Sequence, residues 1–126
     1  MVTIDSSTGD IACYTGEAFT LNFYFWTDSA NTVPKDMTGQ TVRFTVKRTK
    51  DIDPTDANAV IKVDYVVVTP PAINLAVITV DQNGSTTGSK IVAGQYYYDV
   101  KVHPLTGANY YAYASKFSVT QSVTNR

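Results

Sequence analysis

The chain has 126 residues, 44% of them hydrophobic and 17% charged, and its formal net charge at pH 7 is −1. This balance is typical of a globular protein and excludes a disordered chain. The length favours a single domain over residues 1–126, which can bury about two thirds of its surface and fold without disulfides. The near-neutral charge argues against the basic surface of nucleic-acid-binding proteins, so we expect no nucleic-acid partner.

A single cysteine, Cys13, excludes an intrachain disulfide, and we expect it to be a small buried apolar residue. A lone cysteine also suits synthesis in a reducing compartment. The N-terminal MVTIDSSTGD lacks the basic start and the apolar run of a secretory signal. The longest apolar stretch, Val66–Val68, is far too short to cross a membrane. We therefore expect synthesis in the cytoplasm and no membrane partner.

The residue usage favours strands over helices. Tyr occurs nine times, and Val and Thr are frequent, and these side chains fit a pleated sheet. Helix formers are scarce, with Glu17 as the only glutamate. Short strand-like runs alternate with turn residues along the whole chain, a rhythm typical of a sandwich or a barrel.

The N-terminal part of the chain contains a weak predicted strand at Ile11–Tyr14 and a strong one at Glu17–Trp26. Side chains in the strong segment alternate with a period of two, which is a strand pattern, because a helix would scatter them around its axis. The polar segment 27–41 that follows is rich in turn residues. One face of the strong strand takes Phe19, Leu21, Phe23 and Phe25, and the other takes Thr20, Asn22, Tyr24 and Trp26.

Three further strands are predicted in the middle of the chain, at Gln40–Arg48, Ala59–Val68 and Ala72–Val80. Pro70–Pro71 separates the last two, because proline cannot donate to a ladder. The alternation points these residues inward: Val42, Phe44, Val46, Ile61, Val63, Tyr65, Val67, Ile78 and Val80. It points these outward: Thr41, Arg43, Thr45, Lys47, Lys62 and Asp64.

The last two predicted strands are Gln95–His103 and Asn109–Thr120, joined by a hairpin loop that contains Pro104 and Gly107. Six or seven strands and no helix predict an all-β fold, an immunoglobulin-like antiparallel β-sandwich. The inward positions are Tyr96, Tyr98, Val100, Val102, Phe117 and Val119, and the outward ones are Tyr97, Asp99 and Lys101.

A tyrosine early in the penultimate predicted strand matches a known structural device. In many sandwiches such a tyrosine donates its hydroxyl to the chain just upstream, which forms a tyrosine corner. Gly94, Tyr96 and Tyr98 have the spacing of that device, with Tyr98 at the position where antibody domains place a cysteine. We expect Tyr96 to form the corner and Tyr98 to fill the space of the absent disulfide.

The sequence contains no recognisable catalytic or metal-binding set, so we expect no enzyme and no cofactor. His103 is the only histidine, which excludes a pair of histidine ligands, and we expect it near solvent at a strand end. The acidic run Asp51–Asp56 resembles a calcium loop, but its spacing differs from an EF-hand, and a solvated turn fits better. The formal glycosylation site Asn83–Ser85 fits a turn better as well.

Several aromatic side chains are predicted to point away from the core. Tyr24 and Trp26 do so on the predicted strand Glu17–Trp26, and Tyr97 does so on the predicted strand Gln95–His103. Such residues form protein interfaces or sugar platforms, unless a loop or a neighbouring strand covers them. We expect an interface at Tyr24, Trp26 and Tyr97. A further group of tyrosines crowds the last strand, namely Tyr110, Tyr111 and Tyr113.

The order of short motifs resembles a known family. These motifs are Gly16–Leu21, Asp36–Phe44, Ile78–Val80, Gly94–Val100, Lys116–Val119 and Val123–Thr124. In this order they are similar to the small immunoglobulin-like virion proteins of tailed bacteriophages, and in particular to the N-terminal domain of the baseplate upper protein family. The baseplate family continues into further segments, whereas this sequence stops at Arg126.

The resemblance implies a structural protein of the virion that binds other virion proteins and performs no chemistry. A capsid decoration, a collar and a tail or baseplate module all remain open, and we expect many copies or a homo-oligomer in the particle. The alternative from a different class is a carbohydrate-binding or adhesin-like module, whose platform would include Tyr24 and Trp26.

Overall fold

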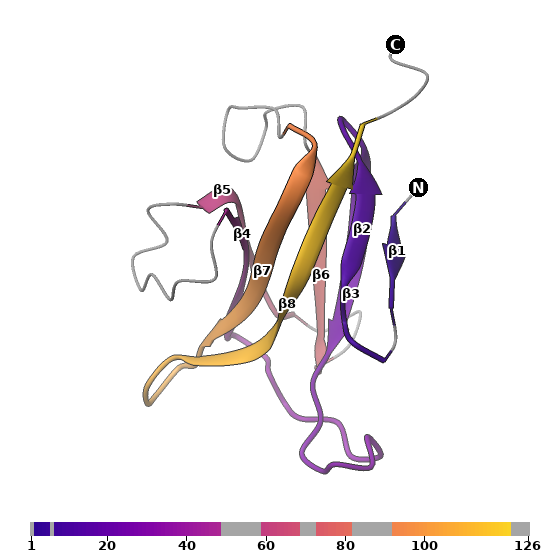
Figure 1. The fold of residues 1–126 in the computed structure, drawn as a ribbon. Helices are drawn as coiled ribbons and strands as arrows, with labels where there is room; N and C mark the ends of the chain where they lie inside the picture. Colours follow the sequence, from indigo (N-terminus) through magenta and orange to yellow (C-terminus); the bar gives the residue numbers. More distant parts are fainter. Residues whose placement is uncertain (1, 6, 49–58, 69–72, 82–91, 122–126) are drawn as a thin grey trace.

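The fold is an all-β sandwich of two unequal sheets. The structure is a computed structural model, and it describes residues 2–5, 7–48, 59–68, 73–81 and 92–121. Eight strands and no helix occur in these residues, and the two sheets face each other, with β7 and β8 in front of β3 and β6 in Figure 1. The strands are β1 Thr3–Ile4, β2 Ile11–Tyr14, β3 Ala18–Tyr24, β4 Thr41–Lys47, β5 Ala59–Val66, β6 Leu75–Asp81, β7 Gly94–His103 and β8 Tyr110–Thr120.

The larger sheet has six strands in the order β1-β2-β8-β7-β4-β5, and the smaller sheet pairs β3 with β6. The chain therefore crosses between sheets after β2, β3, β5 and β6, and the β2–β8, β7–β4 and β3–β6 pairs join distant parts of the sequence. The strong alternation at residues 17–26 forms β3, and the regular one at residues 95–103 forms β7, as predicted.

The core lies between the two sheets and is rich in aromatic rings. Phe23 of β3 stacks on Phe44 of β4 with ring centroids 6.0 Å apart, and Phe44 lies 5.6 Å from Tyr98 of β7. Phe19 reaches Phe117 of β8 at 6.3 Å. These contacts confirm the predicted inward faces, and burial of such side chains is the main term that holds the sheets together.

The prediction of six or seven antiparallel strands was wrong in two details. The described residues form eight strands, because the two-residue strand β1 pairs with β2, and two residues are too few to show a periodicity. The β2–β8 pair is parallel, with Ile11 opposite Phe117 and Cys13 opposite Val119. Cys13 is buried, as expected, and is not part of a disulfide.

Some side chains that point outward from the larger sheet are nevertheless shielded from water. The register places Thr45, Lys47 and Lys101 on the outer face of the larger sheet, as the alternation predicts. All three are nevertheless buried, at 0%, 3% and 3% exposure. Alternation along a strand fixes which face a side chain takes, but neighbouring strands of a wide sheet decide how much water reaches it.

The tyrosine corner is confirmed. The Tyr96 hydroxyl donates to the carbonyl oxygen of Val92 at 2.8 Å. Tyr98 is 5% exposed and fills the core, and its hydroxyl donates to the carbonyl oxygen of Gly9 at 2.7 Å. The burial of this ring raises the pKa of Tyr98 to about 12. Tyr98 thus links the N-terminal loop to β7, at the position where antibody domains have a disulfide between the sheets.

Three sequence predictions lie outside the described residues: the acidic run Asp51–Asp56, the formal glycosylation site Asn83–Ser85 and the break at Pro70–Pro71.

Candidate functional site

The exposed aromatic residues Tyr24 and Trp26 lie together at the end of β3. Tyr24 is 44% exposed, and Trp26 follows the strand and is half-buried. Their rings stack with centroids 6.3 Å apart and an interplanar angle of 25°. The sequence placed both on the outward side of one strand, and the structure brings them into one aromatic surface.

A short loop fixes the position of Trp26. Trp26 forms an isolated antiparallel bridge with Pro34, and Lys35 N donates to the carbonyl oxygen of Phe25 at 3.1 Å. Inside the loop, the Asp28 carboxylate accepts hydrogen bonds from Thr32 N at 3.0 Å and Val33 N at 3.1 Å. Hydrogen bonds from the Thr32 hydroxyl and these amides lower the pKa of Asp28. The Asp28 side chain thus holds the loop closed by accepting hydrogen bonds from the backbone on its other side.

The aromatic surface borders a hollow of about 270 Å³. Lys35 Nζ donates to the Tyr110 hydroxyl at 3.0 Å across one wall. The Tyr113 hydroxyl donates to the carbonyl oxygen of Tyr24, and burial raises the pKa of Tyr113. Side chains from β3, β8 and the loop therefore meet here, and the walls include Tyr24, Trp26, Asp28, Asn31, Lys35 and Tyr113.

The sequence did not indicate that Tyr111 and Tyr113 take opposite faces. Strict alternation would place them on the same side of β8. A register shift lies between Val100 and Lys101, so that Tyr113 pairs with Val100 and Tyr111 pairs with Lys101. The bulge therefore sends Tyr113 to the inner side and into the hollow, whereas Tyr111 stays outside. No residue pattern marked this bulge, and none marked Lys35 as part of the site.

The third predicted interface residue, Tyr97, lies on the opposite side of the sandwich. It is half-buried on the outer face of the larger sheet, with Lys47 on one neighbouring strand and Lys116 on the other. Tyr97 therefore does not share a patch with Tyr24 and Trp26.

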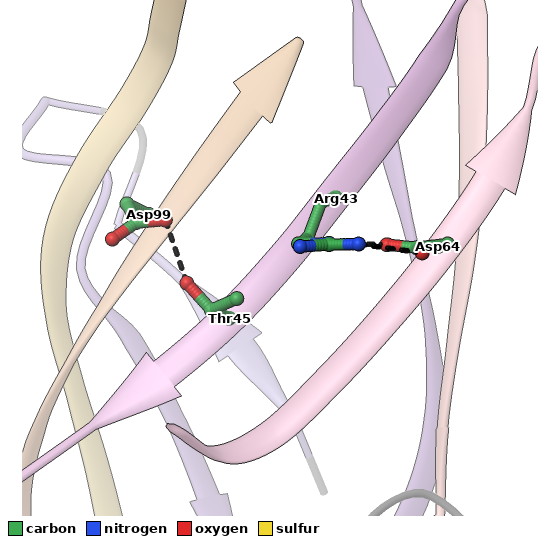
Figure 2. A network of polar contacts seen from close by, with 4 residues as sticks. All are labelled: Arg43, Thr45, Asp64 and Asp99. Carbon is green, nitrogen blue, oxygen red and sulfur yellow. Dashed lines mark hydrogen bonds and ion pairs between the residues drawn. The ribbon is translucent and has the colours of Figure 1, made fainter. Parts of the chain in front are cut away.

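The outer face of the larger sheet carries a network of polar and charged side chains, four of which appear in Figure 2. Arg43 of β4 makes two hydrogen bonds to Asp64 of β5, at 2.7 and 3.1 Å. Asp99 of β7 accepts from the Thr45 hydroxyl at 2.6 Å and lies 3.6 Å from Lys47 Nζ. The Arg43 guanidinium lowers the pKa of Asp64. These groups satisfy one another across three strands and leave little capacity for a ligand.

The one histidine of the chain lies at the end of a strand of the larger sheet. His103 ends β7 opposite Thr41 and is half-buried. Its Nε2 is buried and has no hydrogen-bond partner, so the expectation of a solvated histidine was wrong. Among the described residues, no group of three or more His, Cys, Asp or Glu side chains could hold a metal ion.

Comparison of the chain with models of known protein families, with curated proteins and with solved structures found no match. Within the described part of the chain, no helix has the length and apolar character needed to span a membrane.

Proposed function

We propose that this chain is a non-catalytic structural module of a bacteriophage particle, and that it binds other virion proteins through the aromatic surface at the end of β3. The observation that carries the binding role is the stacked pair Tyr24 and Trp26 beside the hollow. Exposed aromatic side chains held rigidly on a strand and a closed loop are typical anchors of protein interfaces. The particle itself is suggested by the sequence resemblance.

The strand order supports the immunoglobulin-like assignment on which that resemblance depends. In an immunoglobulin sandwich, strands B and E share one sheet, and strands G, F and C are neighbours in the other. Here β3 and β6 occupy the places of B and E, and β8, β7 and β4 those of G, F and C. The tyrosine corner at Tyr96 is a further feature of that class.

A carbohydrate-binding module is the second candidate, because a stacked Tyr–Trp pair beside a hollow is also a surface on which a sugar ring can lie. A sugar further needs polar side chains that are free to bind its hydroxyl groups. Two of the polar groups in the hollow are engaged within the chain, since Asp28 accepts from the loop amides and Lys35 donates to Tyr110. We therefore favour a protein partner.

The test begins with the neighbouring genes, because the proposal requires genes for capsid, portal or tail proteins beside this one. Their products are then co-expressed with the chain, and the affinity of each complex is measured. Replacement of an interface anchor typically costs about 2 kcal/mol or more, so Trp26→Ala and Tyr24→Ala should each weaken binding about thirtyfold.

The matched control is Tyr111→Ala, which removes a tyrosine of similar exposure, 42%, from the opposite face. It should leave the affinity unchanged. Equal losses for Tyr111→Ala and Trp26→Ala would reject the aromatic surface as the binding site. A set of sugar-utilisation genes nearby, together with a glycan-array signal lost in Trp26→Ala, would replace the virion proposal with the carbohydrate one.

A further inference from the structure

The smaller sheet leaves one edge of β3 open. β6 pairs with the other edge along the whole strand without a register shift, from Ala18 opposite Asp81 to Tyr24 opposite Leu75. No described residue forms a backbone ladder with the open edge. Ala18, Thr20, Asn22 and Tyr24 are all exposed, so another polypeptide can reach this edge.

The pairing pattern shows which backbone groups point to that edge. Phe25 N donates to the carbonyl oxygen of Asn74, directly opposite, so this is a hydrogen-bonded pair. In an antiparallel ladder such pairs alternate with pairs whose backbone groups point away from each other. Counting back from Phe25, the odd-numbered residues of β3 bond to β6. The N–H and C=O groups of Ala18, Thr20, Asn22 and Tyr24 therefore point to the open edge.

Both ends of this edge are closed by the chain itself. At one end the Tyr24 carbonyl oxygen already accepts the Tyr113 hydroxyl. At the other end, a turn from Tyr14 to Glu17 precedes the strand, with Glu17 N donating to the Tyr14 carbonyl oxygen. The residues of β3 whose N–H and C=O groups both remain open to this edge are thus Ala18, Thr20 and Asn22, with Thr20 at the centre.

β3 also lacks the features that usually block an exposed edge. Proteins protect such edges with charged residues, proline, bulges or very short strands. The other edge strands have such features, since β1 has only two residues, β5 carries Lys62 and Asp64, and β6 ends in Asp81. β3, in contrast, has seven residues without a charge or a proline. The edge of β3 is the least protected among the described strands.

We propose that the edge of β3 pairs with the same edge of a second copy of this chain, antiparallel and across a two-fold axis at Thr20. In this register Thr20 faces Thr20 and Ala18 faces Asn22, and both copies use the same three residues. A two-fold axis needs an edge that is symmetric about one residue and free of like charges, and the closed ends and uncharged sequence of β3 provide both. The sheet already contains a similar threonine pair, since the Thr20 and Thr79 hydroxyl oxygens are 3.4 Å apart.

The experiment measures mass by sedimentation up to about 1 mM chain, where even a weak dimer is populated. Wild type should approach twice 13.8 kDa. Thr20→Lys places two like charges on the axis and should weaken the dimer at least about tenfold. The control is Thr79→Lys, because Thr79 is the exposed cross-strand partner of Thr20 on the far strand of the sheet, and it should dimerise normally.

Two further measurements make the test specific to this register. An equimolar mixture of Thr20→Lys and Thr20→Glu chains should restore the dimer, because opposite charges then meet on the axis. In wild type, hydrogen exchange at the amides of Ala18, Thr20 and Asn22 should slow as concentration rises, and this readout stands even if a variant misfolds. A wild type that stays at 13.8 kDa at about 1 mM, or amides that exchange at an unchanged rate, would overturn the proposal. Either result leaves the binding role of Trp26 untouched.

Discussion

The two outer faces of the sandwich are built in different ways. On the larger sheet, charged side chains from three strands pair with one another, and Lys47 and Lys101 are almost fully buried. On the smaller sheet the outward residues of β3 are uncharged, and its open polar groups include the backbone groups of the free edge. The inner faces of the two sheets share one hydrophobic core.

This difference indicates which side of the molecule is available to partners. A buried charge that already has its counter-charge gains little from a new contact, and separating the pair is costly. An uncharged strand edge gains hydrogen bonds without loss of an existing one. We therefore expect substitutions on the outer face of the larger sheet to change the free energy of unfolding. Substitutions on the smaller sheet should instead change the affinity for partners.

The largest effect is expected at Asp99, which serves both Thr45 and Lys47. Asp99→Ala removes the carboxylate beside a lysine that is 3% exposed and leaves the buried threonine hydroxyl without its acceptor. Loss of one partner of a buried pair costs about 3 kcal/mol. The control Thr79→Ala changes an exposed position on the smaller face and should cost less than about 0.5 kcal/mol. Urea unfolding measures both, and equal costs would remove the distinction between the two faces.

Except in β8, where a bulge interrupts the alternation, the sequence was sufficient to predict which side of a strand faces the core, because one period-two pattern decides it along the strand. Phe19, Phe23, Phe44 and Tyr98 are buried as predicted, and Tyr24 is exposed as predicted. The tyrosine corner could also be predicted, since it depends on neighbours within one short segment.

What the sequence could not supply depends on contacts between distant segments. Lys47 carries the charge of a surface residue, and its register beside Asp99 supplies a counter-charge that the residue pattern does not reveal. Tyr113 enters the hollow because of a bulge opposite Val100, and the residue types do not reveal that bulge. For the same reason, Tyr97 could not be separated from Tyr24 until the strands were assigned to sheets.

A smaller effect is expected at Tyr98, which lies in the core between the two faces. Tyr98→Phe removes the hydrogen bond to the Gly9 carbonyl oxygen and should cost about 1 kcal/mol at neutral pH. The ordinary pKa of tyrosine is 10.0 and burial raises it to about 12 here. The folded state therefore keeps the Tyr98 proton to a higher pH than the unfolded chain does. The contribution of protonated Tyr98 to the free energy of unfolding is complete below pH 10 and is lost as pH rises toward 12.

Wild type should accordingly lose stability between pH 10 and 12, and Tyr98→Phe should lose less over the same range. The control Tyr111→Phe alters an exposed ring outside the core and should follow the wild-type curve. Chemical denaturation at several pH values measures the slopes. Identical slopes for wild type and Tyr98→Phe would show that another group controls the alkaline range.

The smallest effect is expected at Asp64, which pairs with Arg43 at the exposed margin of the larger face. The side chains are 45% and 24% exposed, so water and salt screen the pair, and Asp64→Asn should cost about 0.5 kcal/mol. Because the hydrogen bond from Arg43 lowers the pKa of Asp64 below 3.8, the stabilisation is present above that pH and is lost as pH falls through the lowered value.

Salt distinguishes this pair from a carboxylate held by neutral donors. The pKa of Asp36 is also lowered, but by hydrogen bonds from Thr38 rather than by a cation. Added salt should therefore reduce the cost of Asp64→Asn and leave the cost of Asp36→Asn nearly unchanged, as measured by thermal unfolding at low and high ionic strength. If both costs respond equally to salt, the Arg43–Asp64 contact contributes as a hydrogen bond and not as a charge pair.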